Sequence, residues 1–166
     1  MADITLKGNP FKTEGDVPAA GDMIEDFSLV DTNLEVVSKK SYEGSKLVLN
    51  CFPSIDTPVC AESVKKFNSE AASLDGVKVL CISKDLPFAL KRFCGAEGLD
   101  DVVPLSAFRD ADLSHKLGLT IQDGPLAGLF ARAVVVLDDS GKVLYSQLVK
   151  EVADEPDYSA ALQALS

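Results

Sequence analysis

The chain has 166 residues, a hydrophobic fraction of 46%, a charged fraction of 25% and a formal net charge of −10. These values are typical of a globular protein, and the length fits one domain, residues 1–166, with a core of its own. The negative balance, with no basic cluster longer than a pair, makes nucleic acid and anionic membranes poor partners. No apolar run approaches bilayer length and residues 1–16 contain no secretory signal, so we expect a cytoplasmic protein without membrane contact.

Short strands are predicted in the first part of the chain. Residues 4–7 and 11–13 flank a Gly-Asn-Pro turn and predict a small hairpin, and residues 27–30 and 35–37 predict a second one. Residues 46–52 form a largely apolar run, which is typical of a central strand covered on both faces. We therefore expect the sheet to be built around residues 46–52.

The middle of the chain alternates helix and strand. Helical spacing of apolar residues from Pro58 to about Leu74, followed by an apolar run over residues 77–82, predicts a right-handed strand–helix–strand unit. Asp85 is expected to cap the next helix, which ends near Gly95 or Gly98. The remaining predicted elements are an irregular or near-edge strand at 102–108 containing Pro104, a helix at 111–117, a hairpin of 131–137 with 143–149, and a last helix at 157–165.

The stretch from Pro53 to Cys60 is where we expect the chemistry. The strand breaks at Pro53, and Asp56 or Thr57 can cap a helix that Pro58 opens at its first position. Cys60 then lies in the first helical turn, where unpaired N–H groups and the helix dipole favour a thiolate over a thiol. In an open α/β sheet this loop lies at the carboxyl end of its strand, the usual place for a site. The alternative is that Cys60 packs as a small buried hydrophobe.

The other cysteines and the single histidine argue against metal or dithiol chemistry. The four cysteines contain no Cys-x-x-Cys pair, so neither a structural zinc site nor a thioredoxin-type dithiol is expected. Four cysteines without a secretory signal also suggest a reducing compartment. We expect no metal and no cofactor.

Three motifs carry a resemblance that extends over nearly the whole chain. The spacing Pro53-x-x-x-Thr57-x-x-Cys60 resembles the active-site signature of the peroxiredoxins. The longer motifs resemble the thiol peroxidase branch of that family: Pro53-Ser54-Ile55-Asp56-Thr57-x-Val59-Cys60, Arg92-Phe93-Cys94-Gly95-Ala96-Glu97-Gly98-Leu99 and Ala131-Arg132-Ala133-Val134-Val135-Val136. The resemblance implies an α/β, thioredoxin-like fold with a mixed central sheet flanked by helices and an N-terminal β-hairpin extension.

The resemblance also implies a thiol-dependent peroxidase that reduces hydroperoxides with the Cys60 thiolate. A helix terminus contributes only about 0.3–1 kcal/mol, up to about 2 when partly buried, so a nearby cation is needed to favour the thiolate. The resemblance nominates Arg132, which lies in an apolar run where an unpaired arginine would be costly. Complete ionisation of a free thiol gains only about thirtyfold at pH 7, so orienting the peroxide matters more. Thr57 and Arg132 are expected to do this, and Pro53 to shield the thiolate; Thr57 could equally be a plain helix cap and Pro53 a strand terminator.

A sulfenic acid at Cys60 would condense with a second thiol, and three candidates remain. Cys51 and Cys81 lie in apolar strand runs, where packing is the expected role. Cys94 lies beside Gly95 and Gly98, where unwinding is cheap, and its surroundings resemble the resolving motif of the family. The resemblance thus implies an intramolecular Cys60–Cys94 disulfide, thioredoxin as reductant and a homodimer.

Two questions stay open at this point. An apolar entrance formed by Phe88, Phe93, Leu126, Leu129 and Phe130 would suit alkyl hydroperoxides, although each of these residues could simply belong to the core. A redox sensor or holdase that uses Cys60 oxidation as a signal is the main alternative function. A thioredoxin-fold binding module with inert thiols is the second alternative.

Overall fold

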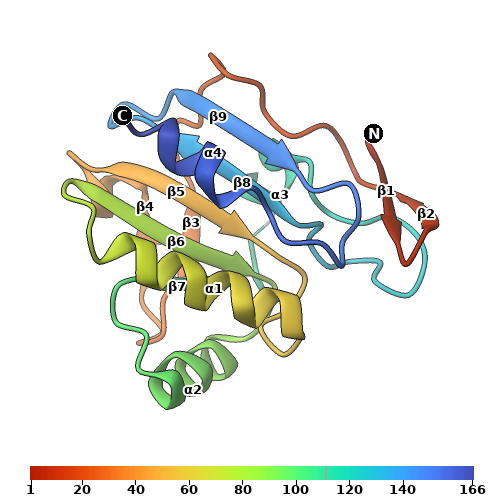
Figure 1. Ribbon diagram of the computed structural model, residues 1–166, viewed down its shortest axis with the longest axis horizontal. Helices are drawn as coiled ribbons and strands as arrows, with labels where there is room; N and C mark the ends of the chain where they lie inside the picture. Colours follow the sequence, from red (N-terminus) through yellow and green to blue (C-terminus); the bar gives the residue numbers. More distant parts are fainter. Residues whose placement is uncertain (111) are drawn as a thin grey trace.

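The computed structural model describes residues 1–110 and 112–166 and contains one seven-stranded mixed sheet with the order β4-β3-β7-β6-β5-β8-β9 (Figure 1). A separate two-stranded hairpin, β1–β2, lies at one end of the molecule. The strands are β1 Asp3–Leu6, β2 Asn9–Lys12, β3 Ser28–Val30, β4 Val36–Ser38, β5 Lys46–Cys51, β6 Val77–Ser83, β7 Val103–Ser106, β8 Ala133–Leu137 and β9 Val143–Leu148. The helices are a 3₁₀-helix η1 Lys39–Tyr42, then α1 Pro58–Ala71, α2 Pro87–Glu97, α3 Asp112–Leu117 and α4 Tyr158–Gln163.

The centre of the sheet follows the predicted strand–helix–strand pattern. β5 and β6 are parallel and joined by α1, β6 and β7 are parallel and joined by α2, and β8 runs antiparallel to β5. The register pairs Cys51 with Ile82, so that β5 and β6 end side by side. The loops that follow these two strands, residues 52–57 and 84–86, therefore meet at the same edge of the sheet.

Alternate residues of the central strands enter two different cores, because successive side chains of a strand point to opposite faces. Val48 packs with α1, α2 and α4 on one face, the face that Figure 1 shows in front of the sheet. Leu47, Leu49 and Cys51 pack on the other face, with α3. Cys60, Cys81 and Cys94 all belong to the first core, so Cys51 is separated from them by the sheet.

Two local predictions need correction. Asp85 does not cap α2: the N-cap residue is Leu86, and the Asp85 carboxylate is bonded elsewhere. The strand with Pro104 is shorter than predicted and lies between β6 and β3, although it pairs with β3 only at Val30–Ser106. A proline is tolerated there because the strand makes so little contact on that side. The 3₁₀-helix η1 was not predicted, and the predicted start of the helix at 111–117, residue 111, lies outside the described residues.

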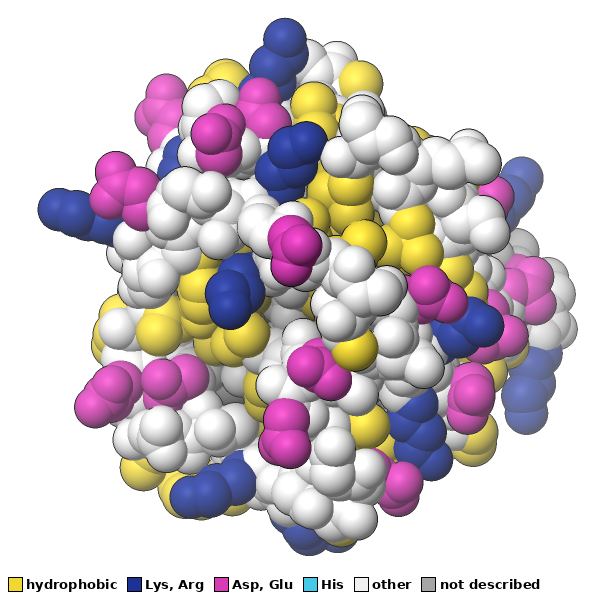
Figure 2. All heavy atoms as spheres, turned by 60° about the vertical axis from the view of Figure 1, so that its left-hand side comes forward, with side chains coloured by type: hydrophobic (Ala, Val, Ile, Leu, Met, Phe, Trp, Pro, Cys, Tyr) yellow, Lys and Arg dark blue, Asp and Glu magenta, His cyan; other side chains and the backbone are white. Residues whose placement is uncertain are grey.

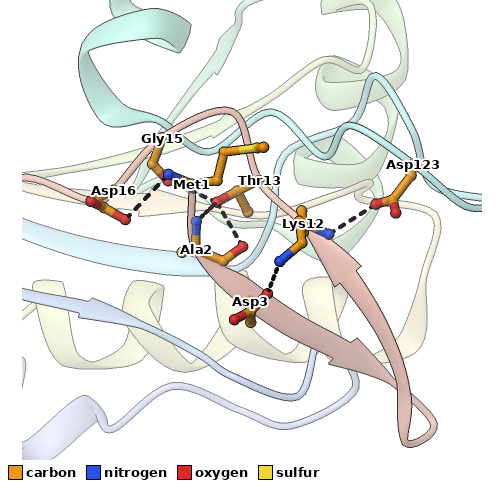
Figure 3. A network of polar contacts seen from close by, with 8 residues as sticks. All are labelled: Met1, Ala2, Asp3, Lys12, Thr13, Gly15, Asp16 and Asp123. Atoms are coloured by element: carbon orange, nitrogen blue, oxygen red, sulfur yellow. Dashed lines mark hydrogen bonds and ion pairs between the residues drawn. The ribbon is translucent and has the colours of Figure 1, made fainter.

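The β1–β2 hairpin is fastened to the body by a small polar network (Figure 3). Thr13 is fully buried, and its hydroxyl accepts a hydrogen bond from the Ala2 N–H (3.1 Å) and donates one to the Gly15 carbonyl (2.8 Å). The Lys12 ammonium donates to Asp3 (2.6 Å), and the Lys12 N–H donates to Asp123 (2.8 Å). A buried hydroxyl with two partners holds the hairpin in one position.

The surface carries charges of both signs. On the face shown in Figure 2, acidic and basic side chains lie intermingled, with apolar side chains in separate patches between them. None of the helices in the described part of the chain is long and apolar enough to cross a bilayer.

Candidate active site

Cys60 lies where the sequence predicted it, in the first turn of α1. Thr57 is the N-cap residue with extended backbone angles, and Pro58 occupies the first helical position. Cys60 is the third residue of the helix, where backbone N–H groups have no partner one turn earlier and the helix dipole is positive. The Cys60 side chain is fully buried.

Arg132 approaches Cys60 from the other side. It immediately precedes β8, and its Nη2 donates a hydrogen bond to the Cys60 Sγ at 3.1 Å. Its Nε donates to the Val152 carbonyl at 3.0 Å, which fixes the plane of the guanidinium. Only 2% of the side chain is exposed, and no carboxylate among the described residues forms an ion pair with it. Burying a cation without a carboxylate partner is costly, and the Cys60 sulfur is the side-chain group that this guanidinium contacts.

One nitrogen of this arginine has no partner. Arg132 Nη1 is buried and makes no hydrogen bond within the described part of the chain. An unpaired buried donor is costly unless a ligand satisfies it. Nη1 therefore marks a position beside the Cys60 sulfur where a small oxygen-containing ligand would be held.

Thr57 and Pro53 lie at the same place. The Thr57 hydroxyl does not cap the helix by a side-chain bond; it donates instead to the Ser54 carbonyl at 2.8 Å. Because its hydrogen is used there, the free lone pairs of the hydroxyl can accept a hydrogen bond from a ligand. Thr57, Pro53 and Arg132 all line one pocket.

That pocket has a volume of about 270 Å³ and is almost entirely apolar. It is formed by three segments far apart in the sequence, together with the start of α1. Its walls are Leu6, Lys7, Pro53, Ser54, Thr57, Pro58, Val59, Leu126, Leu129, Arg132, Val152 and Ala153. Of the predicted entrance residues, Leu126 and Leu129 line the pocket, whereas Phe130 is buried in the core on the α3 face. Phe88 is 65% exposed on α2 and Phe93 packs beside the α1 core, so neither lines the pocket.

Sequence reasoning missed two contributions to this site. The β1–β2 hairpin supplies Leu6 and Lys7 to the pocket, and Val152 supplies the carbonyl that orients Arg132. No local pattern points to either, because both depend on tertiary contacts: the Arg132–Val152 bond spans 20 residues, and the hairpin meets segments much further along the chain.

Asp85 was also assigned the wrong role: it was expected to cap α2, but its carboxylate binds the loop that precedes α1. Its Oδ1 accepts from the Ser54 hydroxyl (2.8 Å), and its Oδ2 accepts from the Ile55 N–H (2.7 Å) and the Ser83 hydroxyl (2.6 Å). The signal that could have found this arrangement is the parallel register. Ser54 follows Cys51 by three residues as Asp85 follows Ile82, and Cys51 and Ile82 are paired.

Cys94 lies in the last turn of α2, which ends at the left-handed Gly98. It belongs to the same apolar core as Cys60 and is 8% exposed, and all four cysteines are free thiols. Burial, with a smaller contribution from the negative charge of Asp100, raises the pKa of Cys94 to about 11. Burial also raises the pKa of Cys51, to about 12, and that of Cys81. These three thiols are neutral at pH 7.

Within the described residues, no group of His, Cys, Asp or Glu side chains is arranged to hold a metal ion. The chemistry of the site is thus that of a buried thiol in contact with a buried arginine, and the arginine lines an apolar pocket.

Comparison with known proteins agrees with this chemistry. The family model described as Redoxin matches residues 19–162, so the chain belongs to the redoxin family. It is 55% identical to the thiol peroxidase of Corynebacterium glutamicum over the whole length of both chains, and 54% identical to that of Mycobacterium tuberculosis over 99% of each. Within the family, the protein is thus a peroxidase of the thiol peroxidase branch of the peroxiredoxins.

Solved structures confirm the predicted fold class. A peroxiredoxin-like protein from Aquifex aeolicus superposes with a TM-score of 0.92 at 37% identity, covering 99% of this chain and 96% of that one. A thiol peroxidase from Chromobacterium violaceum has the same fold, with a TM-score of 0.90 over 98% of this chain and 94% of that one, at 24% identity.

Proposed function

We propose that the protein reduces hydroperoxides through a Cys60 thiolate, a Cys60 sulfenic acid and a Cys60–Cys94 disulfide that thioredoxin reduces. The observation that carries the proposal is the 3.1 Å contact between the buried Arg132 Nη2 and the Cys60 sulfur. A buried guanidinium without a carboxylate partner stabilises a thiolate, and a thiolate is the form that attacks a peroxide.

In the first step the Cys60 sulfur attacks one peroxide oxygen and the O–O bond breaks. The sulfur is oxidised to a sulfenic acid, and the other oxygen leaves as an alkoxide or hydroxide that takes up a proton. The unpaired Arg132 Nη1 is placed to donate to a peroxide oxygen, and the Thr57 hydroxyl, already donating to Ser54, accepts the peroxide O–H. Pro53 keeps water from the sulfur at the pocket wall.

In the second step the Cys94 thiol attacks the sulfenic sulfur, giving a disulfide and water. The position of Cys51 on the opposite face of the sheet supports Cys94 over Cys51. Cys81 is in the same core as Cys60 but lies inside the central strand β6, where its sulfur accepts a hydrogen bond from Asn50 Nδ2 at 3.7 Å. Moving Cys81 would break the sheet, whereas Cys94 lies near the end of a short helix.

The pocket supports alkyl hydroperoxides as preferred substrates. Its walls are mostly aliphatic, with Leu126, Leu129 and Val152 next to Arg132, and its volume exceeds the needs of hydrogen peroxide. An organic chain would displace water from these walls, which is favourable by about 25 cal/mol per Å² of apolar surface. We expect hydrogen peroxide to be reduced more slowly.

Thioredoxin as reductant, a homodimeric assembly and a cytoplasmic location complete the proposal. They are supported by the family relationship and, for the location, by four free cysteines, which persist in a reducing compartment.

The test is steady-state turnover of cumene hydroperoxide and of hydrogen peroxide with thioredoxin, thioredoxin reductase and NADPH, followed by mass mapping of the peroxide-treated protein. We expect repeated turnover, a preference for cumene hydroperoxide and one disulfide joining Cys60 to Cys94. Consumption of a single equivalent without cycling would contradict the enzyme and favour a redox sensor. Peroxide consumption with no loss of the Cys60 thiol would contradict the assigned nucleophile.

A further inference from the structure

Asp85 joins the two segments that carry the reactive cysteines. It lies between the end of β6 and the start of α2, the helix that carries Cys94. Its carboxylate accepts hydrogen bonds from Ser54 and Ile55, in the loop that precedes the helix of Cys60. The Ser54 carbonyl in turn accepts hydrogen bonds from the Thr57 hydroxyl and the Thr57 N–H. Asp85 is thus connected, through Ser54, to the N-cap residue of α1.

The hydrogen bonds of Asp85 hold these two segments together more strongly than the other polar bridge between them. A carboxylate that accepts three hydrogen bonds at 2.6–2.8 Å makes charge-assisted bonds, which are about twice as strong as neutral ones. A second bridge between the same segments, from Arg92 on α2 to Asp56 at 2.9 Å, has side chains that are 69% and 59% exposed. Exposed ion pairs contribute little. Asp85 is therefore the principal polar link between the loop of residues 53–57 and the start of α2.

We propose that Asp85 is a positioning residue that latches the Cys60 loop to the base of the Cys94 helix, and thereby sets how often the Cys60 sulfenic acid is over-oxidised before it forms the disulfide. This inference rests on the disulfide mechanism proposed above. Disulfide formation needs the two Cα atoms within about 7 Å and both cysteines at suitable angles. Both are buried within helices, so the segments must shift relative to one another, and the Asp85 bonds oppose that shift.

The sulfenic acid has two competing fates. The Cys94 thiol attacks the Cys60 sulfur, an S–S bond forms, and the hydroxyl leaves with the thiol proton as water. Alternatively a second hydroperoxide oxidises the sulfenic acid to a sulfinic acid and is itself reduced to the alcohol. The first fate requires the latch to open, whereas the second uses the closed site with Arg132 in place. A tighter latch therefore favours over-oxidation.

The latch also bears on the protonation of Cys94. Burial holds the Cys94 pKa at about 11, so the closed form contains almost no thiolate. When the latch opens and water reaches this sulfur, the burial effect is lost and a larger fraction of Cys94 ionises. Opening of the latch therefore has two effects: it lets Cys94 approach Cys60, and it raises the fraction of Cys94 present as the nucleophilic thiolate.

The test compares Asp85→Ala and Asp85→Asn with wild type in two rapid-mixing measurements, supported by circular dichroism to check folding. The first is the rate constant for disulfide formation after a single equivalent of peroxide. The second is the sulfinic acid formed per turnover, measured by mass spectrometry. Removing hydrogen bonds to a charged acceptor shifts an equilibrium by roughly tenfold to hundredfold. We expect Asp85→Ala to form the disulfide at least roughly tenfold faster and to accumulate correspondingly less sulfinic acid.

Asparagine gives a conservative rescue. Its oxygen, in the place of Oδ2, can still accept from the Ile55 N–H and the Ser83 hydroxyl, and the Ser54 hydroxyl can rotate to accept from its amide nitrogen. Asp85→Asn should therefore fall between wild type and Asp85→Ala. Arg92→Ala, which removes only the exposed ion pair, should change the rate of disulfide formation less than twofold to threefold.

Asp138→Asn is the matched control. The Asp138 carboxylate also accepts several short bonds, from the Ser140 hydroxyl and from the Ser140 and Lys142 N–H groups, but it lies in the β8–β9 turn, away from both cysteine segments. It should leave both measurements unchanged. If Asp85→Ala does not fold, Ser54→Ala, which removes one of the three donors, should still speed disulfide formation severalfold.

The outcomes separate the latch from the mechanism on which it rests. A wild-type protein that forms no Cys60–Cys94 disulfide overturns the proposed resolving step, whatever Asp85 does. A wild-type protein that forms it while folded Asp85 variants resolve at the same rate or more slowly overturns the latch alone. Equal slowing of peroxide attack and of resolution would also overturn it, because that pattern belongs to general loss of structure.

Discussion

The surroundings of Cys60 and Cys94 differ although both thiols belong to one apolar core. Cys60 is fully buried, lies at the start of the 14-residue helix α1 and contacts a guanidinium that a hydrogen bond to the Val152 carbonyl holds in place. Cys94 is 8% exposed, lies near the end of the 11-residue helix α2 and has the negative charge of Asp100 nearby. Burial raises the pKa of Cys94 to about 11.

The difference indicates a division of labour. The Cys60 side of the molecule is ready for reaction, with its cation, pocket and loop already in place. The Cys94 side holds a neutral thiol, and the proposed mechanism requires this thiol to move before it reacts. In the proposed mechanism, a rigid site around Cys60 favours the reaction with peroxide, and local opening around Cys94 favours formation of the disulfide.

Replacing Cys60 by serine should have the largest effect, because it removes the reactive group of the Cys60 side. Serine preserves the helix start and nearly the same volume but forms no stable anion at neutral pH. We expect peroxide turnover to fall below detection and thermal unfolding to stay close to wild type, measured by the coupled thioredoxin assay and by calorimetry. Turnover that survives in this variant would remove the basis for the whole comparison.

Replacing Cys94 by serine should separate the two sides. Cys60 should still react with one equivalent of peroxide, but the sulfenic acid should then persist, and excess peroxide should convert it to the sulfinic acid. Stopped-flow measurement of the first step and mass spectrometry of Cys60 provide the check. Normal cycling with thioredoxin would mean that Cys94 is not the thiol that resolves the sulfenic acid.

Arg132→Lys tests whether Arg132 acts on the Cys60 side mainly by its charge or by the geometry of its guanidinium. Lysine keeps a positive charge but cannot bond Cys60, the Val152 carbonyl and a peroxide oxygen at once, as the planar guanidinium can. We expect the rate constant for peroxide to fall by roughly a hundredfold. Titration of the Cys60 thiolate by its ultraviolet absorbance should show a smaller effect on ionisation. A rate loss accounted for by ionisation alone would reduce Arg132 to a counter-charge.

Cys51→Ala should have the smallest effect. Cys51 is buried on the other face of the sheet, so we expect a loss of about 1 kcal/mol in unfolding free energy and no change in turnover. A large loss of activity with the fold preserved would show that Cys51 takes part in the redox steps.

The same variant carries a pH signature. Burial raises the pKa of Cys51 from 9.0 to about 12, so the folded state binds this proton more tightly than the unfolded chain does. The stability that results is present below pH 9 and is lost as the pH rises from about 9 towards 12. Denaturant unfolding across that range should show a steeper decline for wild type than for Cys51→Ala. Parallel declines would mean that Cys51 ionises freely in the folded protein.

Much of the fold could be predicted because its signals are local. The apolar runs of β5 and β6, the proline and cysteine at the start of α1, and the glycine at the end of α2 each act within a few residues of their own position. The position of Cys60 in the first helical turn follows from Pro58 alone. These features need no knowledge of distant contacts.

The parts of the site that were missed all depend on tertiary contacts. Asp85 precedes a helix and is a residue type that commonly caps one. The neighbouring loop, however, offers it two donors, Ser83 at the end of β6 offers a third, and those bonds outweigh capping. Leu6 and Lys7 reach the pocket only because the hairpin docks there. The role of Val152 is carried by its backbone carbonyl, which no side-chain pattern can reveal.

The docking of the hairpin has a consequence for the order in which the protein becomes active during synthesis. Thr5 N–H donates to the Lys150 carbonyl (2.7 Å), and Val152 N–H donates to the Thr5 carbonyl (2.8 Å), so β1 cannot dock until residues 150–152 have been synthesised. Val152 also provides the carbonyl that orients Arg132. A nascent chain that has already released Cys60 therefore still lacks its oriented cation and one wall of its pocket. The site around Cys60 is therefore complete only after residue 152 has been translated.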